Sequence, residues 1–312
     1  MTIQSGPEDG LLDPGLAALV GERRRLLNLA YRLLGSLSEA EDVVQETYVR
    51  WYAMSRQRQE AVESVGGWLT TVATRICLNQ LGSARARREQ YVGQWIPEPL
   101  PEPAERFGGA SAAVADDPAD RVTLDESVNM AFMVVLESMT PAERVVFVLH
   151  DVFRYAFAEI AEIVGRSPAA CRQLASSARR RVREARPVSR PMPADQAADV
   201  VRSFKRAWEA KDIGALIGLL DPAVTAIGDG GGHVSALPHP VEGGERVAHF
   251  LVQLAARATD LTFTERIVNG RPGLLAVHAG RTVAVYAFDI VGDRITHIWA
   301  VLNPDKLRLW TT

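Results

Sequence analysis

The sequence predicts a multidomain protein in which two all-α modules are followed by an α+β domain. Helix caps and 3.6-residue apolar periodicity extend over the first 190 residues, two proline-rich segments interrupt them, and alternating apolar strands follow residue 194. The chain has 312 residues, 47% hydrophobic and 23% charged, a length that fits two or three domains. We expect boundaries at 14–89, 90–120, 121–187 and 194–312.

The composition is that of an ordinary globular protein. No apolar run reaches the roughly 18 to 20 residues of a membrane span, and the acidic N-terminus lacks the pattern of a secretory signal. We therefore expect a cytoplasmic protein. Cys77 and Cys171 lie far apart in predicted helices, so we expect two small core residues and neither a disulfide nor a zinc site.

Two linkers separate the modules. Residues 90–120 hold one basic and six acidic side chains, and their "WIPEPLPEP" stretch favours a stiff, extended backbone. A second proline cluster, "RPVSRPMPADQ", ends the next helical segment.

In the first module, "SEAE" predicts a helix start with Ser38 as N-cap and Glu41 at N3. The apolar side of this helix is predicted to face the core with Val43, Val44, Thr47, Tyr48 and Trp51. Its polar side, which is either a solvated face or a binding face, carries Glu39, Asp42, Gln45, Glu46 and Arg50.

After the polar loop "SRQRQEAVES", a further helix is predicted over "VGGWLTTVATRICLNQLGSARARRE". Its core side holds Trp68, Leu69, Val72, Ile76 and Leu81. Its outer side holds Arg75, Asn79, Gln80, Arg85, Arg87 and Arg88. Arginine and amide side chains suit phosphates and base edges, although basic residues at a helix C-terminus also complement the helix dipole.

The second module predicts a helix-turn-helix. Thr140, Pro141 and Glu143 mark one helix start, and "FAEIAEIVGRSPAACRQL" holds a short helix, a turn at Gly165 and a second helix from Ser167. Positions expected to face bases are Ala169, Arg172, Gln173 and Ser176. Positions expected to meet phosphates are Arg179, Arg180, Arg181, Arg183 and Arg186. The alternative is two packed helices with a basic end.

On these residues the first 190 positions resemble a bacterial sigma factor of the extracytoplasmic-function type, which keeps sigma regions 2 and 4. "SEAEDVVQETYVRWY" resembles region 2.2, which implies that its five polar residues dock the β′ subunit of core RNA polymerase. "VGGWLTTVATRICLNQL" resembles the helix that reads the −10 element, with base capture expected within Gln57 to Val65. "FAEIAEIVGRSPAACRQLASSARRRV" resembles region 4.2, which reads the −35 element. The resemblance thus implies core polymerase, through β′ and β, and promoter DNA as partners.

From Ala194 onward, three predicted helices and four β-rich runs indicate a curved antiparallel sheet with helices in its concave side. This order resembles the SnoaL-like, nuclear-transport-factor-2-like cone fold, which serves enzymes and binding modules alike. An enzyme would use Asp229, His233, His278 and Asp289 if they converged inside the cone. Each is more often an ordinary turn or strand residue, so we expect no catalytic residue, no cofactor and no metal.

Three short motifs, "WIPEP", "DGGG" and "NPDKL", resemble signatures of extracytoplasmic-function sigma factors with a fused SnoaL-like domain that acts in cis. Here Ile96 stands in place of leucine, and His233 in place of lysine. The resemblance implies an interdomain regulatory role for Trp95, Ile96, Pro97, Glu98, Pro99, Asp229, Gly230, Gly231, Gly232, Asn303, Pro304, Asp305, Lys306 and Leu307.

The glycines would let the loop approach the proline-stiffened strip closely, because no side chains intervene. Two alternatives remain open from the sequence. In the first, "NPDKL" only caps the last strand while "WIPEP" packs on region 2. In the second, the chain is a DNA-binding regulator whose C-terminal domain senses a small-molecule or protein ligand or is catalytic.

Overall fold

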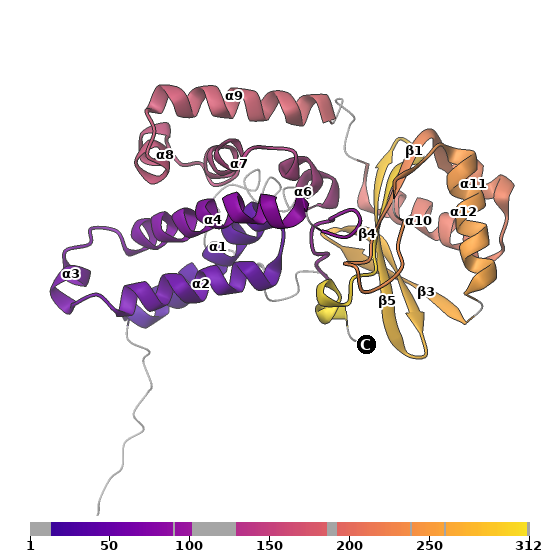
Figure 1. The fold of residues 1–312 in the computed structure, drawn as a ribbon, viewed down its shortest axis with the longest axis horizontal. Helices are drawn as coiled ribbons and strands as arrows, with labels where there is room; N and C mark the ends of the chain where they lie inside the picture. Colours follow the sequence, from indigo (N-terminus) through magenta and orange to yellow (C-terminus); the bar gives the residue numbers. More distant parts are fainter. Residues whose placement is uncertain are drawn as a thin grey trace, which may run out of the picture.

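The computed structural model describes residues 14–89, 91–101, 129–185, 192–237, 239–258 and 260–310, with side chains except at 14–20 and 84–89. Figure 1 shows the helical modules on one side of the molecule and the sheet with its own helices on the other. Most of the predicted acidic linker and Arg186 lie outside the described residues. Within the described ranges, no helix is long and apolar enough to cross a membrane.

The helices of the first module are α1 (Pro14–Leu34), α2 (Leu37–Tyr52), α3 (Arg56–Glu60) and α4 (Val65–Glu89). The predicted N-cap of α2 is wrong by two residues, because Ser36 caps this helix and Ser38 lies in its first turn. Ser36 has an extended backbone, and its hydroxyl accepts a hydrogen bond from the Glu39 amide at 3.4 Å. Gly35, at φ +71°, ends α1 directly before it and so fixes where α2 can begin.

The polar segment before α4 is also more ordered than the predicted loop. It contains the short helix α3, and the Gln59 side-chain amide donates to the Trp51 carbonyl oxygen at 2.8 Å. This bond ties the segment to the end of α2.

The second module consists of α6 (Met130–Glu137), α7 (Pro141–Phe147), a π-helical turn η1 (Val148–Val152), α8 (Phe157–Val164) and α9 (Pro168–Ala185). Thr140 and Glu143 form the predicted capping box of α7. Glu143 also accepts a hydrogen bond from the Ser177 hydroxyl of α9 at 2.6 Å. Gly165, at φ +66°, turns the chain between α8 and α9, which confirms the predicted helix-turn-helix.

The two helical modules pack on each other and share one core. Figure 1 places α7 between α9 and α4, and α4 also contacts α8. Leu69 of α4 belongs to the same buried cluster as Val145 of α7 and Ile160 of α8. Cys77 and Cys171 are fully buried in this cluster, which confirms their predicted place in the core, and both are free thiols.

The C-terminal domain contains α10 (Ala194–Glu209), α11 (Ile213–Leu219), β1 (Leu220–Asp229), β2 (Val241–Glu242), α12 (Gly244–Arg257), β3 (Leu261–Val268), β4 (Arg271–His278), β5 (Arg281–Val291), β6 (Arg294–Val301) and two 3₁₀ turns, η2 (Pro304–Lys306) and η3 (Arg308–Trp310). The strand order is β2-β1-β6-β5-β4-β3. The expected antiparallel sheet is mixed, because β6 lies beside β1 and runs parallel to it. Both strands therefore end at one edge, where Asp229 pairs with Val301.

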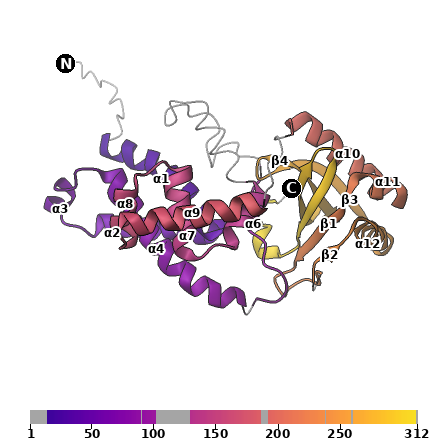
Figure 2. The same cartoon turned by 90° about the horizontal axis from the view of Figure 1, so that it is seen from above.

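The two faces of the sheet have different partners. The face toward α10 and α12 is filled by an aromatic cluster in which the Trp208 ring lies 4.3 Å from Phe263 and 5.2 Å from Tyr286. On the opposite face, Val285 and other strand residues pack against the linker and α6. Figure 2 shows that this domain adjoins the α6 end of the helical modules, far from α3 and α8.

Candidate functional site

The linker segment, residues 91–101, lies between the C-terminal domain and the turn that joins α1 to α2. The Glu98 amide donates to the Gly35 carbonyl at 2.8 Å, and the Glu98 carboxylate accepts from the Leu37 amide at 2.7 Å. The Leu100 amide donates to the side-chain oxygen of Asn269, in the hairpin between β3 and β4, and the Asn269 backbone amide donates to the Leu100 carbonyl. The linker is therefore bonded to both of its neighbours.

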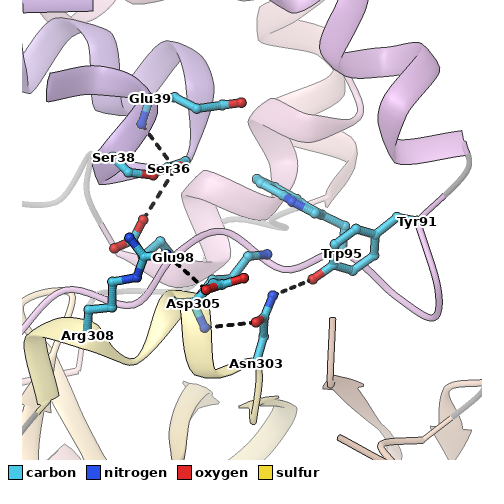
Figure 3. Close-up of a pocket in the computed structure, with 10 residues that line it drawn as sticks. Ser36, Ser38, Glu39, Tyr91, Trp95, Glu98, Asn303, Asp305 and Arg308 are labelled. Atoms are coloured by element: carbon cyan, nitrogen blue, oxygen red, sulfur yellow. Dashed lines mark hydrogen bonds and ion pairs between the residues drawn. The ribbon is translucent and has the colours of Figure 1, made fainter. Parts of the chain in front are cut away.

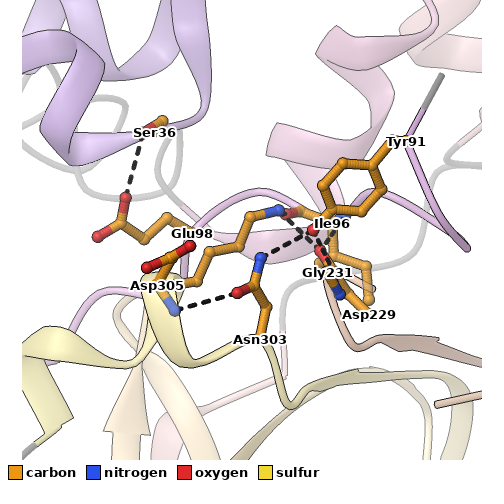
Figure 4. A network of polar contacts seen from close by, with 9 residues as sticks. Ser36, Tyr91, Ile96, Glu98, Asp229, Gly231, Asn303 and Asp305 are labelled. Atoms are coloured by element: carbon orange, nitrogen blue, oxygen red, sulfur yellow. Dashed lines mark hydrogen bonds and ion pairs between the residues drawn. The ribbon is translucent and has the colours of Figure 1, made fainter. Parts of the chain in front are cut away.

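Asp229, at the end of β1, is the centre of a buried polar network (Figure 4). Its side chain has no exposed surface and accepts four hydrogen bonds. Two come from the linker, from the Tyr91 hydroxyl at 2.6 Å and the Ile96 amide at 3.0 Å. The others come from the Gly231 amide at 3.1 Å and the Lys306 ammonium at 2.7 Å. Each of the three sequence motifs thus contributes one partner.

Lys306 is held by more than this ion pair. Its ammonium group also donates to the Ile96 carbonyl oxygen, and it lies 4.2 Å from the Trp95 ring centroid and 5.3 Å from that of Tyr91. A buried cation needs such partners, because an unpaired ammonium costs several kcal/mol to desolvate. Lys306, Trp95 and Tyr91 also line a cavity of about 370 Å³, and Figure 3 shows the two aromatic side chains beside it.

The glycine loop touches the C-terminal motif closely. A Cβ atom on Gly231, which has φ +63°, would lie 2.4 Å from the Asn303 side chain. The Asn303 amide group in turn donates to the Tyr91 hydroxyl at 2.8 Å. His233, which stands in place of the lysine of the resembling subgroup, lies 3.5 Å from the Asp305 carboxylate.

The C-terminal residues also pack on the linker. Leu307 and Trp310 are buried in the cluster that contains Ile96, and the Trp310 indole donates to the Pro99 carbonyl at 2.9 Å. The alternative in which "NPDKL" only caps the last strand therefore does not describe this motif.

Burial shifts the pKa of two groups in the site. It raises the pKa of Tyr91, and the hydrogen bond to Asp229 raises it further, so the hydroxyl keeps its proton and donates. Burial likewise raises the pKa of Glu98, although the hydrogen bonds from Leu37 and Ser36 counteract part of the rise.

The predicted polymerase-docking residues lie on α2, and none of them is among its buried residues. Four of them are exposed: Asp42, Gln45, Glu46 and Arg50. Glu39 is half-buried beside the cavity, and Glu46 pairs with Arg50 at 2.9 Å.

The predicted −10 residues lie on α4. Arg75 donates to the carbonyl oxygens of Ile163 and Glu162 at 3.2 and 3.0 Å, so its guanidinium is bound to the end of α8. Asn79 is exposed and Gln80 is half-buried. The side chains of Arg85, Arg87 and Arg88 lie outside the described part of the structure.

The predicted −35 residues lie on α9. The exposed members are Ala169, Arg172, Gln173, Ser176, Arg180 and Arg183. Two arginines are instead engaged inside the module, Arg179 with Asp151 at 2.7 Å and Arg181 with Glu143 at 3.6 Å.

The four residues of the enzyme alternative do not gather inside the cone. Asp229 is hydrogen-bonded to the linker, and His233 lies on the exposed loop beside Asp305. In the strand register, His278 pairs with Arg281, whereas Asp289 is eight residues further along β5, roughly 25 Å away. Within the described residues, no three His, Cys, Asp or Glu side chains are arranged to hold a metal ion.

Sequence reasoning missed three residues of the interface, Tyr91, Asn269 and Trp310. The Asn269 amide donates to the Tyr31 hydroxyl at 3.0 Å, and that hydroxyl donates to the Glu98 carbonyl at 2.7 Å. Asn269 precedes a glycine, and an Asn-Gly pair indicates only a hairpin turn. The sequence therefore gives no sign that Asn269 also bonds to Tyr31 and to the linker.

Comparisons with known proteins agree with this architecture. Residues 19–87 match the family model of Sigma-70 region 2, and residues 129–182 match that of Sigma-70, region 4. The ECF RNA polymerase sigma factor SigJ of Mycobacterium tuberculosis is 37% identical over 91% of this chain and 90% of its own.

Solved structures include the crystal structure of the same SigJ, with a TM-score of 0.71 and 33% identity over 94% of this chain and 98% of that chain. A SnoaL-like protein from Burkholderia thailandensis matches 35% of this chain and 97% of its own, with 19% identity and a TM-score of 0.29. Two sigma domains, joined to an α+β domain with a mixed sheet, thus make up this chain. It belongs to the extracytoplasmic-function (ECF) RNA polymerase sigma factors.

Proposed function

We propose that this sigma factor is regulated in cis, because its C-terminal domain holds regions 2 and 4 in a closed arrangement through the linker. As a sigma factor it binds core RNA polymerase, recognises −35 and −10 promoter elements and initiates transcription. The observation that carries the regulatory proposal is the Asp229 network, in which the linker, the glycine loop and the C-terminal motif share one buried carboxylate.

The closed arrangement engages a predicted promoter-reading residue. Arg75 of α4 is bonded to the end of α8, and the buried Arg144 of α7 donates to the Leu33 carbonyl of α1 at 2.9 Å. To bind DNA through Arg75, α4 would have to break this contact with α8 and form one with phosphates or bases. The cost of breaking the contact supports an inhibited resting state.

The linker also reaches the predicted docking helix. Glu98 bonds to the first turn of α2, so the position of "WIPEP" is coupled to the helix that we propose contacts β′. Displacing the C-terminal domain would therefore affect both regions. We assign the domain no catalytic step, because aromatic side chains fill the face that its helices cover.

The test is run-off transcription on genomic templates with bacterial core RNA polymerase and the full chain. Lys306→Met should raise the yield, since it weakens the network while keeping most of the side-chain volume. Lys205→Met is the matched control, because Lys205 lies on α10 and pairs with Glu265, away from the linker. Equal yields from the parent chain and Lys306→Met, with both folded, would refute regulation through this network.

A further inference from the structure

The groups around Lys306 are those that recognise an ammonium ion. A carboxylate, a carbonyl oxygen and two aromatic rings surround its Nζ atom, from Asp229, Ile96, Trp95 and Tyr91. Figure 4 shows Asp229, Ile96 and Tyr91, and Figure 3 shows Trp95. Carboxylate and carbonyl oxygens accept the ammonium protons, and aromatic faces attract the charge. We call these four residues the ammonium cage.

The cage is built without help from Lys306. Asp229 keeps hydrogen bonds from Tyr91, the Ile96 amide and the Gly231 amide, which fix its orientation. The linker is fixed separately by the bonds of Glu98 and Leu100 to its two neighbours. The groups that bind the cation are therefore held in place by contacts other than the cation.

A route for a ligand adjoins the cage. The cavity of about 370 Å³ is lined by Lys306, Trp95 and Tyr91 of this centre and by three carboxylates. When a ligand takes the place of Lys306, Glu39 and Asp305 still outnumber Arg308, the remaining cation of the lining, even without Glu98, whose pKa is raised by burial. The surroundings therefore favour a cationic ligand over an anionic one.

We propose that the cage is a binding site for protonated primary amines and that Lys306 is its tethered occupant. An amine that takes the place of Lys306 would release the C-terminal motif from the linker, and this consequence rests on the proposed regulation in cis. The tether gives Lys306 an effective concentration in the millimolar range, so a free ligand needs further contacts in the cavity to compete.

The test uses the full chain with Lys306→Ala, which removes the ammonium and three carbons, and propylammonium as the probe. We expect a saturable rise in its melting temperature, with half-saturation in the millimolar range. Equal concentrations of sodium chloride and of 1-propanol should give no such rise. Lys306→Met, which fills the cage, and the double variant Asp229→Asn/Lys306→Ala, which lacks the carboxylate, should not respond either.

A response of Lys306→Ala no larger than that of Lys306→Met would overturn the proposal. If Lys306→Ala does not fold alone, recovery of folded protein only with propylammonium supports the cage, and no recovery counts against it. Run-off transcription separates the two proposals, because Lys306→Ala already lacks the tether. A melting-temperature rise of Lys306→Ala with propylammonium, together with equal transcript yields from Lys306→Ala and the parent chain, would keep the cage and refute the regulation.

Discussion

Replacing either partner of the Asp229–Lys306 ion pair should destabilise the protein by several kcal/mol. The two atoms are 2.7 Å apart, and the side chains are 0% and 8% exposed, so neither charge can return to water without opening the interface. Removing one partner of a buried pair costs about 3–5 kcal/mol, because the other charge is left uncompensated. We expect that cost for Asp229→Asn, and less for Lys306→Met, since Asp229 keeps three neutral donors.

A double-mutant cycle isolates the pair. The double variant Asp229→Asn/Lys306→Met should be more stable than the sum of the single changes predicts, by about 2 kcal/mol or more. Urea denaturation followed by circular dichroism and by tryptophan fluorescence measures this, and coincident curves would justify a two-state treatment. Strict additivity, or a cost below about 1 kcal/mol for Asp229→Asn, would contradict the network as described.

Three further predictions concern local contacts. Gly231→Ala should cost about 2 kcal/mol more than Gly280→Ala in urea denaturation, because both glycines have positive φ but only the first lies against Asn303; equal costs would contradict the close approach. Glu98→Ala should speed hydrogen exchange at the Leu37 amide while the α7 N-terminus stays protected, and unchanged exchange would show that Glu98 does not hold α2. Burial alone would raise the pKa of Glu143, but its hydrogen bonds lower it below its ordinary value of 4.5, so its contribution to stability is present above pH 4.5 and lost as the pH falls. Glu143→Gln should therefore reduce the dependence of the melting temperature on pH in that acid range, and an unchanged dependence would contradict this.

The sequence was sufficient for the elements whose signals are local. The capping box at Thr140, the turn at Gly165 and the three helices of the C-terminal domain depend on neighbouring residues, and the structure has them as predicted. The N-cap of α2 was wrong because two serines competed, and the choice depends on Gly35 and on the distant Glu98.

Pairing between distant segments was harder to predict. No periodicity reveals that β6 runs parallel to β1, and this pairing is what brings the C-terminal motif beside the glycine loop. The three motifs indicated which segments meet, but not that Asp229 is their shared acceptor or that Tyr91 and Trp310 join them. Those contacts depend on the tertiary fold.

The distance between regions 2 and 4 tests the central claim most directly. Spin labels on cysteines introduced at the exposed Arg58 of α3 and Arg180 of α9 would report it by pulsed electron paramagnetic resonance, since both native cysteines are fully buried. The free chain should give one narrow distribution, which broadens to longer distances in Lys306→Met and on binding core polymerase, whereas Lys205→Met stays narrow. An unchanged distribution in folded Lys306→Met would contradict the claim that the C-terminal domain holds the two regions closed.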